Sequence, residues 1–410
     1  MPFSSLGLSP ALLRALSARA YTLPTPIQAA AIPAVLQDRD VLGSAQTGSG
    51  KTLAFALPLL QQLTQAPGER PRRARALVLV PTRELAAQVG DEFRSLAQHL
   101  DGSLKVTVVF GGVSINPQMM GLRGGTDIVV ATPGRLLDLL DHNALSLAGV
   151  QTLVLDEADR LLDLGFAEEL QRLRALLPAK RQNLFFSATF PPAVQALAQT
   201  LLQDPVRIDV LPAPQTQPDI VQRAIAVDAA QRTQLLRHLI GQQHWSRVLV
   251  FVATKHAAEI VADKLRKADI DAEPFHGELS QGKRTQVLAD FKASRLTVVV
   301  ATDVAARGLD IAQLPVVVNY DLPRSTSDYT HRIGRTGRAG ESGLAVNFVS
   351  AATEAHFRLI EKRQGLQLPR EIVAGFEPVQ TVSEAASTGG VKGKRPSKKD
   401  KLRAAAARNP

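Results

Sequence analysis

The chain has 410 residues, of which 45% are hydrophobic and 21% charged, an ordinary composition for a soluble folded protein. Single cores stop growing beyond roughly 250–300 residues, so a chain of this length predicts two domains. The absence of cysteine excludes disulfides, thiolate metal sites and cysteine nucleophiles, and favours a reducing compartment. No apolar run approaches the length of a membrane span. We expect a cytoplasmic protein with no membrane partner.

The basic charge is unevenly placed along the chain. Lys and Arg number 48 against 38 Asp and Glu, which gives a net charge of +10. From Lys392 to the end, eight basic residues and one acid carry +7, so residues 1–391 carry only +10 − 7 = +3. A basic tail on a nearly balanced body predicts a polyanionic partner that the tail helps to engage.

Short apolar runs alternate with helical patterns through the first half of the chain. The runs predict buried strands over 41–42, 76–80, 106–110, 128–130, 153–155 and 184–186. Helical patterns lie between them, for example over 84–99 and 168–177. This alternation predicts the α/β class, with a parallel sheet covered by helices on both faces.

The pattern breaks after residue 210, where Pro212, Pro214 and Pro218 exclude regular structure. It then restarts, with strands predicted over 220–227, 248–252, 297–300, 316–319 and 345–349. Beyond Phe376 the sequence is too polar to bury a core. We therefore predict two parallel-sheet domains, a linker and a disordered basic tail, over 1–209, 220–375, 210–219 and 376–410 respectively.

A glycine-rich loop follows the first short strand and opens a helix. Its residues are Ala45, Gln46, Thr47, Gly48, Ser49, Gly50, Lys51 and Thr52. Glycines let backbone amides approach phosphate oxygens, and the helix N-terminus adds partial positive charge. Lys51 would reach the β- and γ-phosphates of a nucleoside triphosphate, and Thr52 a magnesium ion. The alternative is a glycine-rich turn without a ligand, since the strict pattern has Gly where Ala45 stands.

Two acids stand directly after the predicted strand 153–155. A P-loop hydrolase needs an acid at the end of a neighbouring strand to hold magnesium, and Asp156 supplies one. Glu157 could orient or deprotonate the attacking water. The competing interpretation is a solvated helix N-terminus, where acids are favoured in any case.

A third candidate lies in the second domain, where Arg332, Arg335 and Arg338 recur at a spacing of three. On a helix they would form a solvated basic stripe, but Gly334 and Gly337 disfavour a regular surface helix. An arginine brought from a second domain to the γ-phosphate raises hydrolysis rates by about 10³ to 10⁵. Such a site would work only when the two domains close.

Nine motifs in a fixed order carry a resemblance. They are PTPIQ at 24–28, the P-loop at 45–52, PTREL at 81–85, GG at 111–112, TPGR at 132–135, DEAD at 156–159, SAT at 187–189, ATDVAARGLD at 301–310 and the arginine segment at 331–338. The set resembles the DEAD-box ATP-dependent RNA helicases, which have two RecA-like domains. That family commonly carries Ala at the position of Ala45. The run at 159–166 and the short basic tail are similar to the bacterial RhlE-type branch.

The resemblance implies an ATP site. Gln28 would bond to the adenine edge, Tyr21 or Phe3 would contact the ring, and Asp310 would bind the ribose. Lys51, Glu157, Arg335 and Arg338 would be the catalytic residues, and Thr52 and Asp156 would hold Mg²⁺. The family usually has Gly where this chain has Ala20.

The resemblance also implies an RNA path across both domains. Small and hydroxyl residues there suit backbone contact without base readout. The implied RNA residues are Thr82, Arg83, Gly111, Gly112, Thr132, Gly134, Arg135, Thr254, Arg284 and Thr302. The residues implied to couple ATP to RNA are Asp159, Ser187, Ala188, Thr189 and His331. Without the resemblance, Thr254 and Thr302 would be interpreted as helix caps.

The implied activity is an ATP-dependent RNA helicase that closes two domains on RNA, hydrolyses ATP when RNA is bound, and locally separates short duplexes or remodels RNA–protein complexes. One alternative is an ATP-gated RNA clamp or scaffold with incidental turnover, and another is a DNA translocase. The sequence leaves open whether the protein partners belong to ribosome assembly or to RNA decay.

Overall fold

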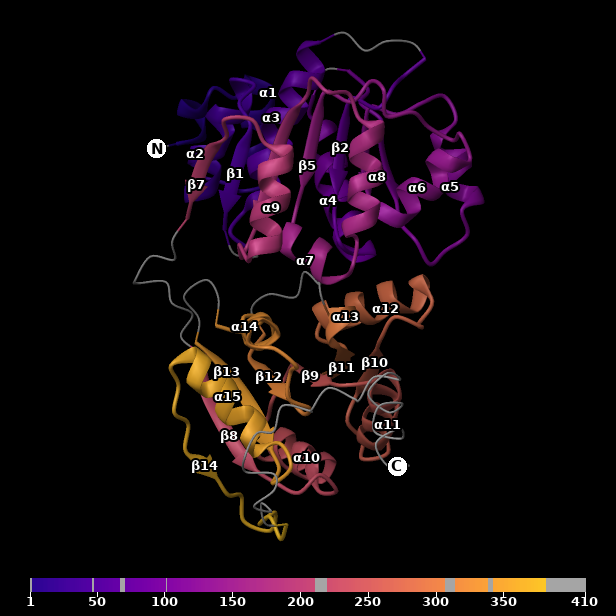
Figure 1. Ribbon diagram of the computed structural model, residues 1–410. Helices are drawn as coiled ribbons and strands as arrows, with labels where there is room; N and C mark the ends of the chain where they lie inside the picture. Colours follow the sequence, from indigo (N-terminus) through magenta and orange to yellow (C-terminus); the bar gives the residue numbers. More distant parts are fainter. Residues whose placement is uncertain are drawn as a thin grey trace, which may run out of the picture. The chain divides into compact units, whose positions relative to one another are not determined.

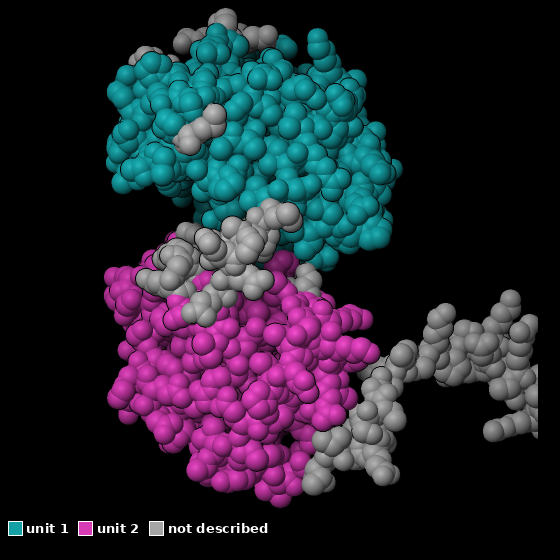
Figure 2. All heavy atoms as spheres, turned by 90° about the vertical axis from the view of Figure 1, so that its left-hand side faces the viewer, with its two compact units in different colours: residues 1–215, 307–310 teal, residues 216–306, 311–410 magenta. Residues whose placement is uncertain are grey.

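The computed structural model describes residues 2–45, 48–66, 71–100, 102–210, 220–306, 314–337 and 342–380. The chain divides into two compact units, unit 1 over 1–215 and 307–310, and unit 2 over 216–306 and 311–410 (Figure 2). The predicted linker beyond residue 210 and the tail beyond residue 380 lie outside the described residues, as do four predicted site residues, Gln46, Thr47, Asp310 and Arg338.

Unit 1 alternates strands and helices as the sequence predicts (Figure 1). Its elements are η1 (Phe3–Leu6), α1 (Pro10–Ala18), α2 (Pro26–Leu36), β1 (Val41–Ser44), α3 (Lys51–Gln65), β2 (Ala76–Leu79), α4 (Arg83–Ala97), β3 (Val106–Val109), α5 (Asn116–Leu122), β4 (Ile128–Ala131), α6 (Pro133–Asp141), β5 (Thr152–Leu155), α7 (Ala158–Asp163), α8 (Ala167–Leu176), β6 (Gln182–Ser187), α9 (Pro192–Leu201) and β7 (Val206–Asp209).

The sheet of unit 1 has the order β3-β4-β2-β5-β6-β1-β7, and its neighbours are all parallel. Both of its faces are buried, which explains why the strands are continuous apolar runs. On one face, Val78 and Phe186 pack in the same core as Phe55 of α3 and Phe93 of α4. On the other face, Leu155 of β5 and its neighbours pack in a second core with α6, α8 and α9. The expected helix-covered parallel sheet is therefore confirmed.

Unit 2 repeats the alternation. Its elements are β8 (Ile220–Ala226), α10 (Arg232–Gln242), β9 (Val248–Val252), α11 (Lys255–Arg266), β10 (Ala272–Phe275), α12 (Gln281–Lys292), β11 (Val298–Thr302), α13 (Asp303–Ala306), β12 (Val316–Asn319), α14 (Thr326–Ile333), β13 (Gly343–Val349), α15 (Glu354–Gln364) and β14 (Arg370–Glu371).

The sheet of unit 2 has the order β10-β11-β9-β12-β13-β8-β14. When each unit's strands are counted from its own first strand, both sheets have the same order, 3-4-2-5-6-1-7. One face packs in a core with α10 and α11, and the other in a core with α14 and α15. The two units are thus two copies of one topology, as the α/β prediction of paired domains requires.

Three strands were not predicted, namely β7, β10 and β14. Each is an outermost strand of its sheet. Pro274 interrupts the strand pattern of β10, and an edge strand tolerates proline because one side of it needs no ladder hydrogen bond. The described chain also continues past residue 375. The ring centroid of Phe376 lies 5.3 Å from that of His238, and the backbone N–H of Val379 donates to Asp228 Oδ2 at 2.8 Å. Among the described residues, no helix is long and apolar enough to span a bilayer.

Candidate nucleotide and nucleic-acid site

The strand order of unit 1 brings three motifs together. β5, β6 and β1 are adjacent in the sheet, and the DEAD run, the SAT run and the P-loop each lie at the carboxyl end of one of them. In a parallel sheet the carboxyl ends of all strands lie on the same side, which is the carboxyl end of the sheet. Open α/β sheets bind ligands there. The P-loop, the DEAD run and the SAT run therefore share one half of the carboxyl end of the sheet.

The P-loop lysine is buried and already held in place. Lys51 begins α3, is 6% exposed, and its Nζ donates to the carbonyl oxygen of Ala45 at 3.0 Å. Gly50 before it has φ +92°, and a Cβ there would lie 2.4 Å from Nε2 of Gln28. Glycine is required at this position by both conformation and space. The ammonium thus lies at the helix N-terminus, where a phosphate would be favoured.

Gln28 connects the PTPIQ run to this loop. Its Oε1 accepts from the backbone N–H of Thr25 at 2.9 Å, and its Nε2 donates to the carbonyl oxygen of Gly50 at 3.0 Å. If the Gln28 amide binds the edge of a base, the same amide also contacts the P-loop through Gly50. Of the two aromatics predicted to contact adenine, Tyr21 is 39% exposed, whereas Phe3 is 4% exposed and packs in the core. The geometry favours Tyr21.

Tyr21 has a cation beside it that the sequence did not reveal. The guanidinium of Arg19 lies 5.3 Å from the centre of the Tyr21 ring and makes two hydrogen bonds to Glu92 of α4, at 2.6 and 2.8 Å. The hydrogen bonds to Glu92 raise the pKa of Arg19. Between Arg19 and Tyr21, Ala20 has φ +58°, a left-handed conformation that explains the glycine usual in the family.

Asp156 is a buried carboxylate, and the positive charge of Lys51 does not fully offset the effect of burial on its pKa. It is 2% exposed, and burial raises its pKa to about 6, although Lys51 Nζ lies 4.0 Å from Oδ1 and opposes the shift. Glu157 and Asp159 raise that pKa further. With Thr52 in the first turn of α3, the site offers one carboxylate and one hydroxyl. This donor set fits Mg²⁺, which binds few protein oxygens and takes its other ligands from phosphates and water.

Glu157 has a strained backbone. Its φ and ψ are both 52°, a left-handed conformation that costs on the order of 1–3 kcal/mol for a residue other than glycine. The side chain is buried, and its Oε2 lies 3.5 Å from Nη1 of Arg160 without a hydrogen bond. Such outliers persist where the surrounding structure holds them, often at active sites.

Three of the five residues predicted to couple ATP to RNA, namely Asp159, Ser187 and Thr189, form one hydrogen-bonded cluster in unit 1, whereas His331 belongs to unit 2. Asp159 Oδ2 accepts from both the backbone N–H and the hydroxyl of Thr189, at 3.0 and 2.7 Å. The backbone N–H of Asp159 donates to Ser187 Oγ at 3.2 Å, and that hydroxyl donates to the carbonyl oxygen of Thr189 at 2.7 Å. Ala188 lies between them in the chain. The DEAD and SAT runs are therefore joined by side chains, and not only by strand pairing.

The RNA candidates of unit 1 occupy the other half of the carboxyl end of the sheet. They follow β2, β3 and β4, which are neighbours in the order β3-β4-β2. Arg135 is 8% exposed and donates to the carbonyl oxygen of Val113 at 2.7 Å, and thus joins the TPGR run to the loop that contains Gly112. Thr82 caps α4 and accepts from the backbone N–H of Leu85, so its hydroxyl also has a structural role.

Two of these glycines have no packing reason to be glycine. A Cβ at Gly111 or Gly134 would meet nothing within 4 Å. Gly134 is the second residue of α6, in the first turn of the helix. At Gly112, in contrast, φ is +78° and a Cβ would meet the guanidinium of Arg83 at 2.4 Å. Bare backbone at Gly111 and Gly134 leaves room for a partner that approaches closely.

Unit 2 places its RNA candidates on the equivalent strands β10, β11 and β9. Thr302 ends β11, and Thr254 caps α11 by accepting from the backbone N–H of Ala257 at 3.1 Å. Arg284 of α12 is 3% exposed, lies over the ring of Phe275 and donates to the carbonyl oxygen of His276 at 2.8 Å. Within each unit, the structure gathers the predicted RNA residues onto the same three strand positions.

The arginine segment begins on α14, which contains His331, and leaves the helix at Gly334. Arg335 therefore lies beyond the helix end, as the glycines predicted, and is 6% exposed. The sequence did not assign a role to Arg332. In the structure it is 2% exposed and makes two hydrogen bonds to Asp303, at 2.6 and 2.7 Å. No sequence signal indicates this pair, because 29 residues separate its members.

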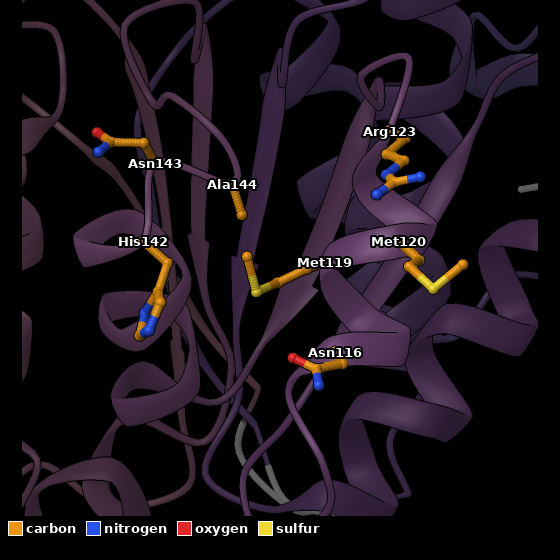
Figure 3. Close-up of a pocket in the computed structure, with 7 residues that line it drawn as sticks. All are labelled: Asn116, Met119, Met120, Arg123, His142, Asn143 and Ala144. Carbon is orange, nitrogen blue, oxygen red and sulfur yellow. The ribbon is translucent and has the colours of Figure 1, made fainter.

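Two surface hollows of unit 1 contain none of the predicted site residues. One, of about 540 Å³, lies between α5 and the loop after α6 (Figure 3), and its lining residues are Asn116, Met119, Met120, Arg123, His142, Asn143 and Ala144. The other, of about 470 Å³, is mostly leucine-lined and lies between α8 and α9. The predicted chemistry is thus concentrated at the strand ends, away from these two hollows.

Comparison with known proteins agrees with this arrangement. Residues 25–197 match the family model of the DEAD/DEAH box helicases, and residues 231–340 match that of the helicase conserved C-terminal domain. The chain is 43% identical to the ATP-dependent RNA helicase SrmB of Escherichia coli over 91% of this chain and 83% of that protein. It is 41% identical to the ATP-dependent RNA helicase DeaD of Buchnera aphidicola over 90% of this chain and 60% of that protein.

Solved structures give the same result. S. cerevisiae Dbp5 bound to RNA and ADP BeF3 matches with a TM-score of 0.77 at 30% identity, over 90% of this chain and 95% of that one. Mss116p bound to ssRNA and AMP-PNP matches with a TM-score of 0.79 at 28% identity, over 93% and 79%. The RecA-like fold of both units is therefore shown, and the chain belongs to the DEAD-box family of ATP-dependent RNA helicases.

Proposed function

We propose that this chain uses ATP binding and RNA-stimulated hydrolysis to close its two units on RNA, and thereby separates short duplexes locally or remodels RNA–protein complexes. One observation carries the proposal: within each unit the motif residues lie at the carboxyl ends of parallel strands. In unit 1 the nucleotide candidates and the RNA candidates occupy adjacent halves of the carboxyl end of the sheet. Both ligands would favour the closed state, so each would raise the affinity for the other.

In this proposal ATP binds to the P-loop, residues 45–52, and to the PTPIQ run. Lys51 binds the β- and γ-phosphates from the N-terminus of α3. The side-chain amide of Gln28 accepts one hydrogen bond from the adenine edge and donates one to it, a geometry that an amide can match. Tyr21 packs on the ring. Asp310 binds the ribose. Thr52 and Asp156 hold Mg²⁺, which supplies charge neutralisation for the phosphates when it is bound.

Glu157 orients or deprotonates the attacking water, and Arg335 and Arg338 stabilise the charge that develops on the γ-phosphate. The strained backbone of Glu157 supports this role because it places the carboxylate beside Asp156 in a conformation that folding alone does not favour. The arginines belong to unit 2, so hydrolysis would depend on closure. RNA would control turnover in this way.

The proposed RNA contacts are made to the backbone of a single strand. They involve Thr82, Arg83, Gly111, Gly112, Thr132, Gly134 and Arg135 of unit 1, and Thr254, Arg284 and Thr302 of unit 2. The bare backbones of Gly111 and Gly134 support them. Contacts of this kind carry little sequence information, so binding would be largely independent of RNA sequence. Asp159, Ser187, Ala188, Thr189 and His331 would transmit the state of the ATP site to this surface.

Three finer features belong to the same proposal. Membership of the RhlE-type branch is supported by the run at 159–166 and by the short basic tail. A cytoplasmic location is supported by the absence of cysteine, typical of reducing compartments. Protein partners would come from ribosome assembly or RNA decay. The competing function is an ATP-gated RNA clamp, in which the bound complex is the activity and turnover is incidental.

Two assays of the full chain separate the helicase from the clamp. Steady-state ATPase is measured with and without single-stranded RNA, and displacement of a short RNA duplex is measured under the same conditions. A helicase is expected to show RNA-stimulated ATPase and ATP-dependent displacement, both lost in Lys51→Ala. RNA binding that depends on ATP, without displacement, would contradict the helicase and support the clamp. Stimulation by DNA as strong as that by RNA would indicate a DNA translocase, because the 2′-hydroxyl distinguishes the two.

A further inference from the structure

Unit 2 contains a pair of asparagines inside its sheet. Asn319 of β12 and Asn347 of β13 are directly paired in the parallel register, and both are fully buried. Nδ2 of Asn319 donates to Oδ1 of Asn347 at 2.8 Å. Strands buried on both faces are normally apolar, and the three residues before Asn319 are all valine. Packing alone therefore does not explain why two asparagines lie here.

One end of the pair holds the guanidinium of Arg332, a residue of α14. Nη1 of Arg332 donates to Oδ1 of Asn319 at 2.9 Å and to the carbonyl oxygen of Asp321 at 2.6 Å. Nε and Nη2 donate to the two carboxylate oxygens of Asp303. The ring of Phe251 lies 4.9 Å from the same guanidinium. Four of its five N–H donors are thus directed at fixed acceptors.

The other end of the pair holds the same helix one turn earlier. Nδ2 of Asn347 donates to the hydroxyl of Tyr329 at 3.2 Å and to the carbonyl oxygen of Arg223 at 3.0 Å. The Tyr329 hydroxyl donates in turn to Oε1 of Gln222 at 2.7 Å. Burial raises the pKa of Tyr329 to about 12, so this donor keeps its proton. The chain of hydrogen bonds runs from Asp303 to Gln222 without a break.

Tyr329 and Arg332 are three residues apart, so they lie on one face of α14. Two bonded positions on one face fix both the rotation and the axial position of a short helix. A shift of one residue along the helix would move each side chain by about 1.5 Å and 100°. Oδ1 of Asn319 would lose its bond from Arg332, and Nδ2 of Asn347 would lose its bond to Tyr329. An unpaired buried polar group costs about 1–3 kcal/mol, which makes the wrong register expensive.

The end of α14 leads directly into the arginine segment. Gly334 ends the helix, and Arg335 follows it. Any displacement of α14 therefore displaces Arg335, and a misplacement of about 1 Å can lower an enzymatic rate by about 100-fold. A valine or leucine pair at 319 and 347 would pack between the strands, but it would not specify where α14 lies.

We propose that Asn319 and Asn347 are positioning residues for ATP hydrolysis: they hold α14 so that Arg335 is correctly placed when the two units close. The inference rests on the proposed function, in which Arg335 acts on the γ-phosphate. Neither asparagine touches the nucleotide. Both act through Arg332 and Tyr329 on the helix that carries the arginine.

The experiment is a double-mutant cycle in the full chain between Asn347→Leu and Arg335→Ala. Asn347→Leu keeps the number and branching of the side-chain heavy atoms and removes the hydrogen bonds. We expect kcat at saturating ATP and RNA to fall about 10- to 100-fold, with the KM for ATP changed less than threefold. In the Arg335→Ala background the same substitution should have almost no further effect, since its route to the reaction is already lost.

The matched control is Thr233→Val. It removes another hydrogen bond next to the same sheet, the 2.9 Å bond between the hydroxyls of Thr233 and Tyr320, and neither residue belongs to α14. Its kcat should stay within about twofold of the unmodified chain. Fluorescence of Trp245, the single tryptophan and a buried residue of unit 2, reports whether each variant is folded at the assay temperature.

Tyr329→Phe is the second test if Asn347→Leu fails to fold. It removes only the hydroxyl and keeps the ring packed on Phe357, 6.3 Å between centroids. A smaller loss of kcat that disappears in the Arg335→Ala background supports the inference. Normal kcat in both variants, or losses that multiply with that of Arg335→Ala, would overturn it while leaving the proposed function intact. Normal turnover in Arg335→Ala alone would overturn both.

Discussion

Arg160 of unit 1 and Arg332 of unit 2 are both buried beside site residues, but their guanidinium groups are hydrogen-bonded to different extents. Arg160 of unit 1 is 3% exposed, and neither of its terminal nitrogens has a hydrogen-bond partner within the described residues. Its nearest carboxylate is Glu157, at 3.5 Å. Arg332 of unit 2 is 2% exposed and donates four hydrogen bonds, two of them to the carboxylate of Asp303.

The same contrast extends to the carboxylates. Asp156 of unit 1 has a pKa raised to about 6 by burial, and Glu157 has a strained backbone. Asp303 of unit 2, in contrast, lies in a bidentate pair. Among the described residues, Arg160 and Asp156 of unit 1 are therefore incompletely paired, whereas Arg332 and Asp303 of unit 2 make two hydrogen bonds to each other. We expect a bound ligand to complete the pairing in unit 1, and α14 of unit 2 to be held in place by its own contacts.

The largest effect is expected at the incompletely paired site. Glu157→Gln keeps the size of the side chain and removes its negative charge, so ATP and RNA should still bind while turnover falls by about 10² to 10⁴. Steady-state ATPase and RNA binding in the presence of ATP are the measurements. Glu168→Gln, an exposed position at the start of α8, should change neither. Normal ATPase in Glu157→Gln would remove the catalytic role from this residue.

Arg332→Met tests whether unit 2 is organised by its internal pairing. It leaves Asp303 and Asn319 without their partner. Breaking a fully buried ion pair costs about 3–5 kcal/mol, and we expect a smaller loss here because the Asp303 side chain is 25% exposed. Thermal unfolding followed by Trp245 fluorescence, which reports on unit 2, should shift to lower temperature. Arg160→Met, at the matched arginine of unit 1, should cost less, because that guanidinium makes few hydrogen bonds to lose. Since Trp245 lies in unit 2, amide hydrogen exchange in unit 1 measures this loss. Equal losses of stability would contradict the contrast between the units.

The cluster of Ser187, Thr189 and Asp159 is the well-paired exception within unit 1. Replacing both hydroxyl residues by Ala removes side-chain hydrogen bonds worth about 0.5–1.5 kcal/mol each without touching Lys51 or Asp156. We expect duplex displacement to fall roughly tenfold more than ATPase does. The measurement is the number of duplexes displaced per ATP hydrolysed. Equal losses in both assays, or none, would leave these hydroxyls with a structural role only.

The acid stability of unit 2 gives a smaller effect. Burial would raise the pKa of Glu354 and of Glu361, but hydrogen bonds from Arg370 outweigh it and lower both. A lowered carboxyl pKa stabilises the fold above the ordinary value and loses that contribution as the pH falls through the folded value. Arg370→Met should therefore lose on the order of 1 kcal/mol or less at pH 7, and the difference should shrink below about pH 4.

That prediction is checked by denaturant unfolding at several pH values, again followed by Trp245. Arg358→Met is the control, since Arg358 is exposed and bonds only to Glu354 among the described carboxylates. A difference between Arg370→Met and the unmodified chain that does not depend on pH would show that the stability comes from packing on Phe357, whose ring lies 4.9 Å from the guanidinium.

The smallest effect is expected at Ala20. Its left-handed conformation costs roughly 1–2 kcal/mol for alanine, while glycine loses roughly 0.5–1 kcal/mol of backbone entropy on folding. Ala20→Gly should therefore stabilise unit 1 by about 0.5–1 kcal/mol. Ala30→Gly, at an exposed position within α2, should destabilise it by a similar amount. Amide hydrogen exchange in unit 1 measures both, and effects of the same sign would contradict this assignment of strain.

The local sequence determined most of the individual elements and the type of residue at each strand end. Apolar runs such as 76–80 and 316–319 predicted strands because both faces of a parallel sheet are buried. Glycines at 48, 50 and 334 predicted a phosphate loop and a helix end, since backbone conformation is a local property. The strand β10 was missed because Pro274 is tolerated only where the strand is known to lie at an edge.

The tertiary structure alone decided which strand ends are neighbours. Strand order depends on how each crossover helix packs against the whole sheet, and no local pattern specifies it. That order separates the nucleotide candidates after β5, β6 and β1 from the RNA candidates after β3, β4 and β2. It also pairs Asn319 with Asn347, and Arg332 with Asp303, across 28 and 29 residues of chain. Such contacts form only when distant segments pack together, so the positioning of the arginine segment was not visible in the sequence.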